Sequence, residues 1–254
     1  MDKLSISGLL IAILAIYLGF IIDGGSISSL LELPAFIIVF GGTLGAVMLQ
    51  SSQVQFLHAI TLLKWLFVPP KYDVEQGIES IVEWAEKARE SGFLSLEYIA
   101  EEENDFFVNK GLNLLVDGAE VENLRVSLEL DLDLYREHNL RSAHVFESMG
   151  GYSPTIGILG AVLGLIQAMS FINDPEQLGT GIATAFIATI YGVGLANLLF
   201  LPMANKLKQR VEQKMLYHEM LAEGVIAISQ GESPINIELK LEAYRVERPI
   251  LQAH

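Results

Sequence analysis

Four long stretches of this sequence contain no Asp, Glu, Lys, Arg or His. They cover residues 4–22, 33–49, 152–172 and 179–205. An α-helix needs about 20 mostly apolar residues to cross the ~30 Å hydrocarbon core of a bilayer. Each stretch is close to that length, and the second can be extended through residues 50–53 without adding a charge. The sequence therefore predicts four membrane-spanning helices.

The first stretch has one alternative interpretation, as a cleaved signal peptide. Lys3 would suit the positively charged start of such a peptide. However, Ile21, Ile22 and Asp23 offer no small-residue cleavage site. A retained membrane helix is therefore the favoured interpretation.

The basic residues lie on one side of this pattern. The short connections 23–32 and 173–178 contain no Lys or Arg, and all 16 basic residues lie elsewhere. Lys206, Lys208 and Arg210 directly follow the fourth stretch. Because cytoplasmic flanks of membrane helices are enriched in Lys and Arg, both termini and the middle segment are predicted to be cytoplasmic. The two short connections are predicted to face the outside.

The middle segment carries most of the negative charge. The chain has a net charge of −15, and residues 50–151 contribute −11 of it. This acidic balance argues against nucleic-acid binding, which needs a basic surface. The charged face of the segment is expected either to meet a partner or simply to be solvated.

Apolar periodicity predicts amphipathic helices in the charged parts of the chain. Their expected ranges are 52–67, 72–91, 94–103, 106–117, 121–149 and 207–229. The first is predicted to continue the second membrane helix, and the last to leave the fourth directly. Asp73 suits an N-cap and Gly92 a helix end. A solvated spacer would lack such regular apolar faces, so a compact helical domain is favoured over a spacer.

The expected fold is therefore all-α, with four transmembrane helices and a helical cytoplasmic domain between helices two and three. The expected parts are residues 1–50 (two membrane helices), 51–151 (acidic cytoplasmic domain), 152–205 (two membrane helices) and 206–254 (cytoplasmic helix and tail).

Sequence signals of enzymes and metal sites are weak or absent. The chain has no Cys, and its five His residues do not pair at ligand spacing. The segment GGTLGA at residues 41–46 lies inside a predicted membrane helix, without the strand–turn–helix context of a dinucleotide site. We therefore expect no catalytic residue, no metal site and no cofactor.

Ionisable side chains are missing from all four predicted membrane helices. A protein that moves ions through the bilayer on its own side chains needs such a group at membrane depth. If ions pass here, a partner must supply the carboxylate.

Small residues recur at helical spacing in the third and fourth membrane helices. The two sets are Gly157, Ala161, Gly164 and Ala168, and Thr184, Ala188, Gly192 and Ala196, with Thr189 beside the second set. Gly41 and Gly45 form a similar pair in the second helix. Such stripes let membrane helices approach closely. They predict either packing within the chain or an assembly that also encloses another helix.

Two prolines lie near the predicted cytoplasmic ends of these helices. Pro154 is expected at the start of its helix, where a missing amide donor has no cost. Pro202 is expected to remove a hydrogen bond and to weaken or kink the end of its helix. Each is typical of a helix end, and together they suggest a hinge.

Three segments and the overall layout resemble the MotA/PomA family of bacterial flagellar stator subunits. The segments are KARESGFLSLE at residues 87–97, GGYSPTIGILGAVLGLI at 150–166 and IATIYGVGLANLLFLPMANKL at 187–207. The last two are shared more loosely with the ExbB/TolQ energisers of the wider MotA/TolQ/ExbB proton-channel superfamily. The first is characteristic of stators, and the resemblance covers essentially the whole chain.

The resemblance implies an assembly in the bacterial inner membrane, in contact with membrane lipid. Several copies, a pentamer, would form a ring around a dimer of a MotB/PomB-type partner whose aspartate carries the ion. The residues implied to line the ion path are Ala161, Gly164, Thr189 and Gly192.

The resemblance also implies residues for mechanical coupling. Pro154 and Pro202 match the family's coupling prolines. Arg89 and Glu97 match the charged residues through which such proteins contact FliG, the switch protein of the rotor.

The transported ion is expected to be a proton, with sodium as the alternative. Sodium-type members resemble this sequence but have Thr where it has Ala161, whereas Thr189 matches a hydroxyl position near the ion path. A hard cation needs several oxygen ligands, so the loss of one hydroxyl favours the proton.

The leading hypothesis is a stator subunit that converts an ion gradient into torque. One alternative is an ExbB/TolQ-type energiser of an outer-membrane process. The other is a passive membrane scaffold without ion coupling.

Overall fold

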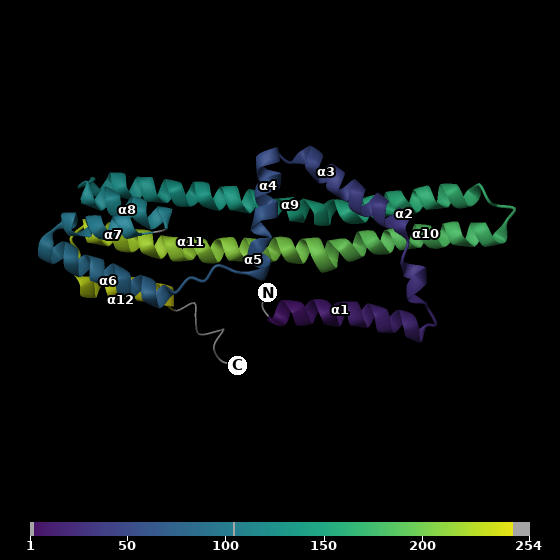
Figure 1. The fold of residues 1–254 in the computed structure, drawn as a ribbon, viewed down its shortest axis with the longest axis horizontal. Coiled ribbons are helices and arrows are strands. Elements are labelled where there is room, and N and C mark those ends of the chain that lie inside the picture. Colours follow the sequence, from purple (N-terminus) through teal and green to yellow (C-terminus); the bar gives the residue numbers. More distant parts are fainter. Residues whose placement is uncertain (1–2, 104, 246–254) are drawn as a thin grey trace. The chain divides into compact units, whose positions relative to one another are not determined.

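The computed structural model describes residues 3–103 and 105–245, and all regular secondary structure in these ranges is helical (Figure 1). The longer helices are α1 (Lys3–Ile22), α3 (Gly42–Gln50), α4 (Gln53–Leu62), α6 (Val74–Ser91), α8 (Phe106–Val116), α9 (Val121–Met169), α10 (Pro175–Gly194), α11 (Leu201–Ser229) and α12 (Pro234–Leu241). The shorter elements are η1 (Ile27–Leu30), α2 (Leu33–Phe36), η2 (Ile37–Gly41), α5 (Lys64–Phe67), η3 (Phe93–Leu96), α7 (Glu97–Glu102), η4 (Leu195–Phe200) and η5 (Glu242–Arg245).

The chain divides into two compact units. The first contains Met1–Pro69 and Asn139–Gln209, and the second contains Pro70–His138 and Arg210–His254. Helices α9 and α11 contribute residues to both units.

The four predicted membrane helices are present. Four helical stretches are long and apolar enough to cross a membrane: Leu4–Ile22, Leu33–Gln50, Val121–Met169 and Pro175–Ser229. The second joins α2, the π-helical turn η2 and α3, and the fourth joins α10, the π-helical turn η4 and α11. The predicted all-α fold with four transmembrane helices is therefore confirmed.

One apolar core lies in the first unit where α3, α4, α9 and α11 meet. Its buried members are Val47, Ala59, Leu62, Ala143, Val145, Phe146, Met149, Phe200, Ala204 and Leu207. A smaller cluster joins Ala35 and Val39 to Ile187 and Ala188 of α10. These clusters position α9, α10 and α11, which carry most of the predicted membrane-site residues.

The prediction that residues 52–67 continue the second membrane helix is wrong. Ser51 and Ser52 are extended, with ψ values of 146° and 152°. The Ser52 hydroxyl accepts a hydrogen bond from the Gln55 amide at 3.2 Å and so caps α4. Serine side chains compete for backbone hydrogen bonds and favour helix starts, which explains the break.

The prediction that the third membrane helix begins near Pro154 is also wrong. The predicted helix 121–149 and the third membrane stretch form one helix, α9, of 49 residues with Pro154 inside it. Gly150 does not end the helix. The side chain of Leu201 packs on it so closely that a Cβ atom there would lie 2.5 Å from Leu201 Cδ2.

The second unit has a packed core of its own. Helix α6 begins after Asp73, whose Oδ1 accepts the Glu75 amide at 3.1 Å, and ends at Gly92 with φ +78°. The largest fully buried side chains of this unit are Ile78, Ile81, Leu96, Leu112, Leu115, Leu124, Leu128, Met215, Met220 and Ile226. This core is not expected of a solvated spacer, and it confirms the helical domain.

Helix α12 is absent from the sequence-based prediction. It begins at Pro234 after the cap Ser233, whose hydroxyl accepts the Asn236 amide at 3.3 Å. Ile237 and Leu241 are its two buried residues. Its four apolar residues, Ile235, Ile237, Leu239 and Leu241, alternate with polar ones, a spacing typical of a strand rather than of a helix.

Candidate functional site

The small-residue stripes lie in the contact between α9 and α10. A Cβ atom on Gly157 would lie 3.0 Å from the Ala188 carbonyl oxygen and from the Gly192 Cα. One on Gly164 would lie 3.1 Å from the Ala185 Cα. The backbones therefore approach as closely as small residues allow. Packing within the chain accounts for Gly157, Gly164, Ala188 and Gly192 of these stripes.

The four residues implied to line an ion path have two kinds of environment. Gly164 and Gly192 are buried in the contact between α9 and α10. Ala161 and Thr189 are half-buried. Thr189 borders an apolar groove of about 490 Å³ whose other lining residues are Ile16, Phe186, Ile190, Val193, Gly194, Asn197 and Leu198. Ala161 and Thr189 are thus the more accessible members of the set.

The two prolines disturb their helices differently. Pro154 lies inside α9, so the Gly150 carbonyl has no amide donor four residues later. Pro202 is the second residue of α11 and follows the π-helical turn η4. π-Turns and prolines are the usual sites of helix kinks. The α-helical hydrogen-bond pattern is thus interrupted by a π-helical turn just before Pro202.

Arg89 and Glu97 lie on one connected segment of the second unit. Arg89 is in the last turn of α6, and Glu97 is the first residue of α7. The segment between them is shaped by Gly92 and by the Ser95 hydroxyl, which donates to the carbonyls of Lys87 and Gly92 at 3.1 and 2.7 Å. Leu96 anchors this segment with no exposed surface. The predicted single helix 94–103 is therefore split into η3 and α7.

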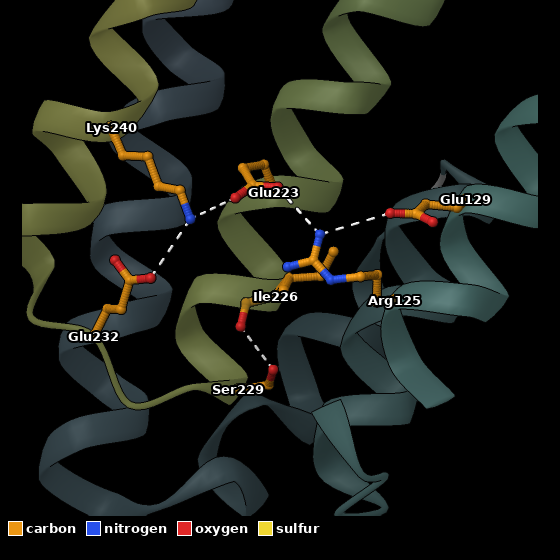
Figure 2. A network of polar contacts seen from close by, with 7 residues as sticks. All are labelled: Arg125, Glu129, Glu223, Ile226, Ser229, Glu232 and Lys240. Carbon is orange, nitrogen blue, oxygen red and sulfur yellow. Dashed lines mark hydrogen bonds and ion pairs between the residues drawn. The ribbon is translucent and has the colours of Figure 1, made fainter. Parts of the chain in front are cut away.

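Both charges point to solvent. Arg89 and Glu97 are exposed, and neither forms an ion pair within the described part of the chain. Several other basic residues of this unit are held by acidic neighbours. In Figure 2, Arg125 pairs with Glu129 and Glu223, and Lys240 pairs with Glu223 and Glu232. Arg89 thus presents its charge outward, whereas these cations join helices.

A buried histidine in the second unit had no role in the sequence-based prediction. His218 is 3% exposed, and its Nε2 lies 3.0 Å from Asp105 Oδ2. The ring stacks on Phe107 at 4.9 Å between centroids. Asp105 also caps α8 by accepting the Phe107 amide at 2.9 Å. The hydrogen bond with His218 is the main cause that lowers the pKa of Asp105 to about 2.

Metal binding has no structural support in the described ranges. Residues 3–103 and 105–245 contain no group of three or more His, Cys, Asp or Glu side chains arranged to hold a metal ion. His218 and Asp105 form a hydrogen-bonded pair beside the Phe107 ring.

Known proteins match this arrangement over the whole chain. The MotA/TolQ/ExbB proton channel family matches residues 99–220, and the motility protein A N-terminal family matches residues 6–92. Motility protein A of Bacillus subtilis is 36% identical over 96% of this chain and 91% of its own length. The chain belongs to the MotA/PomA family. The chemotaxis protein PomA of Vibrio alginolyticus is 35% identical over 87% of each chain.

Solved structures of MotA-family complexes share the fold. The MotAB structure from C. jejuni matches with a TM-score of 0.91 and 29% identity, and each chain is covered completely. The flagellar MotAB stator complex from Bacillus subtilis matches with a TM-score of 0.88 and 34% identity, again over both whole chains. This MotA-family chain is therefore a multi-pass membrane protein of a channel family rather than of an enzyme family.

Proposed function

We propose that this chain is the MotA-type subunit of a bacterial flagellar stator. With a MotB/PomB-type partner, it forms a channel that converts ion flow into torque on the rotor. The observation that carries the proposal is the match of the entire chain to a flagellar stator subunit at a TM-score of 0.88 and 34% identity.

The lack of a carboxylate at membrane depth supports the requirement for a partner. Residues 152–169 of the third charge-free stretch lie in α9, and the fourth stretch, 179–205, lies in α10, η4 and α11. Ion transport across a bilayer needs an ionisable group or a water-filled route. A partner helix with an aspartate would supply that group, and Ala161 and Thr189 would line its path. Gly164 and Gly192 would act by bringing α9 and α10 close together.

The proposed assembly is a pentameric ring around a partner dimer in the bacterial inner membrane, with both termini in the cytoplasm. Large apolar side chains that are exposed in the single chain support further membrane contacts. On α9 these include Ile158, Val162 and Ile166, with exposed fractions of 57%, 48% and 63%. Such a surface suits lipid and neighbouring membrane helices.

The proposed transported ion is the proton. Ala161 offers no hydroxyl, so the path has one oxygen ligand fewer for a dehydrated sodium ion. Sodium dependence of motility would reverse this choice.

The proposed torque contact is made by Arg89 and Glu97 with the rotor protein FliG, and the proline segments transmit movement from the membrane helices. The exposure of these two charges, and their lack of ion-pair partners in the described part of the chain, support the assignment.

Deletion and complementation test this function. A strain that lacks the chain should assemble flagella that do not rotate, and re-expression of the chain should restore rotation. Co-purification should capture a partner with one membrane helix and a peptidoglycan-binding domain. Capture of an ExbD-like partner without that domain would favour the energiser. A passive scaffold would be indicated by function that persists after the transmembrane gradient is removed.

A further inference from the structure

An ion pair joins α9 to α11 in the first unit. Lys208 Nζ donates to Glu147 Oε2 at 2.6 Å, and His144 Nδ1 lies 2.6 Å from the same oxygen. Glu147 and His144 are on α9, and Lys208 is on α11. Hydrogen bonding from Lys208 is the largest cause that lowers the pKa of Glu147, so this carboxylate is ionised at neutral pH.

The pair lies close to both prolines along its two helices. Glu147 precedes Pro154 by two helical turns, and Lys208 follows Pro202 on α11. Leu201, directly before Pro202, packs on Gly150, which lies between Glu147 and Pro154. Near the two prolines, α9 and α11 therefore share this steric contact and the Glu147–Lys208 ion pair, in addition to the apolar core of the first unit.

The Glu147–Lys208 ion pair is expected to add little to the free energy of unfolding. The side chains of Glu147 and Lys208 keep 37% and 34% of their surface exposed. Ion pairs with that degree of exposure contribute little to folding. A pair of this kind can break and re-form readily, while it still favours one axial register between the helices.

We propose that the Glu147–Lys208 pair, with His144 as a second partner of the carboxylate, is a clamp that couples movement of the two proline-containing segments. This proposal rests on the proposed stator function and deepens it. Glu147 and Lys208 are positioning residues for torque transmission, distinct from Ala161 and Thr189 and from Arg89 and Glu97.

Charge exchange tests the clamp in the complete stator complex in cells. The single variants Glu147→Gln and Lys208→Met are compared with the double exchange E147K/K208E and with the conservative Lys208→Arg. Lys240→Met is the matched control, because it removes the two ion pairs of a lysine of similar exposure in the second unit (Figure 2). The readouts are the rotation speed of tethered cells per amount of chain in the membrane, and ion uptake by cells that overproduce the complex.

Each single variant should lower rotation speed by about two- to fivefold, while ion uptake per complex stays unchanged. The exchange and Lys208→Arg should recover most of the speed, and Lys240→Met should have no effect. If a single variant lowers the amount of chain in the membrane, the exchange variant E147K/K208E decides between the two explanations. Recovery of rotation speed supports the clamp, and lack of recovery contradicts it.

Three outcomes would overturn the clamp. The first is wild-type speed in both single variants. The second is an exchange variant no faster than the slower single variant, and the third is ion uptake that falls in proportion to speed. Rotation that continues when the whole chain is deleted would instead refute the stator function. Loss of rotation on deletion, with normal single variants, would refute the clamp alone.

Discussion

Gly192 of α10 lies directly against Gly157 of α9: a Cβ atom on Gly192 would lie 2.9 Å from the Gly157 Cα and 2.7 Å from the Ser153 carbonyl oxygen. Both neighbours are backbone atoms, which cannot move aside as a flexible side chain can. This contact fixes the spacing of the two helices that carry Ala161 and Thr189.

Gly192→Ala should therefore destabilise the first unit by about 1–3 kcal/mol, because the added methyl group overpacks the contact. The unfolding temperature of the detergent-solubilised complex measures this effect. Gly194→Ala on the same helix is the control, since a Cβ atom there meets nothing within 4 Å. Equal losses in the two variants would contradict the account.

Pro154→Ala and Pro202→Ala should impair rotation while the amount of chain in the membrane is maintained. Alanine supplies the backbone amide donor that proline lacks, and it is about 3 kcal/mol more favourable than proline inside a helix. The stiffened helices should transmit less movement. Rotation speed and membrane amount are measured together. Degraded or misfolded protein would instead show that the prolines are structural.

Thr189→Val should lower ion uptake by about fivefold, because one path hydroxyl worth about 1 kcal/mol is lost. Thr184→Val is the control on the same helix, since the Thr184 hydroxyl already donates to the Thr180 carbonyl at 3.1 Å. Uptake is measured in sodium-free medium, where the wild-type chain should remain active. Full uptake by Thr189→Val would remove this residue from the ion path.

Arg89→Glu should reduce swimming speed strongly without changing the amount of chain in the membrane, because an exposed charge toward the rotor is reversed. Lys87→Glu makes the same change in charge two residues earlier, where the side chain pairs with Glu83 at 2.7 Å. That control should retain most of the speed. Equal speeds of the two variants would argue against a specific role for Arg89, and Glu97→Lys repeats the comparison at the other charge.

Asp105→Asn should destabilise the second unit by about 1–3 kcal/mol, because buried His218 loses its charged hydrogen-bond partner. The pKa of Asp105 in the folded chain is about 2, below its ordinary value of 3.8. This carboxylate therefore adds stability that is complete above pH 3.8 and is lost as the pH falls toward 2. Hydrogen exchange of α8 amides measures the loss, and Asp133→Asn on an exposed side chain of α9 is the control. Unchanged protection in Asp105→Asn would contradict this role.

The membrane helices could be predicted from the sequence because missing charge over a span of bilayer length is a strong local signal. The N-cap at Asp73 and the helix end at Gly92 can be predicted equally well, because a cap and a positive φ depend on few neighbouring residues. A proline is typical of a helix start, but in the structure α9 continues through Pro154, and Leu201 packs on Gly150 one turn earlier.

The ion pairs and hydrogen bonds between helices could not be predicted from the sequence, for a different reason. Glu147 and Lys208 are 61 residues apart in the sequence, and His218 and Asp105 are 113 residues apart. No periodicity within one helix indicates which side chains meet across two helices. Gly164 and Gly192 were recognisable as small residues, but their burial against the chain's own helices follows only from the fold.

The most direct measurement is the rotation speed of single tethered motors while the chain is re-expressed in a strain that lacks it. The stator function predicts no rotation before expression, then a rise in speed as the chain accumulates, and no such rise for Arg89→Glu. Motors that turn at full speed without the chain would contradict it.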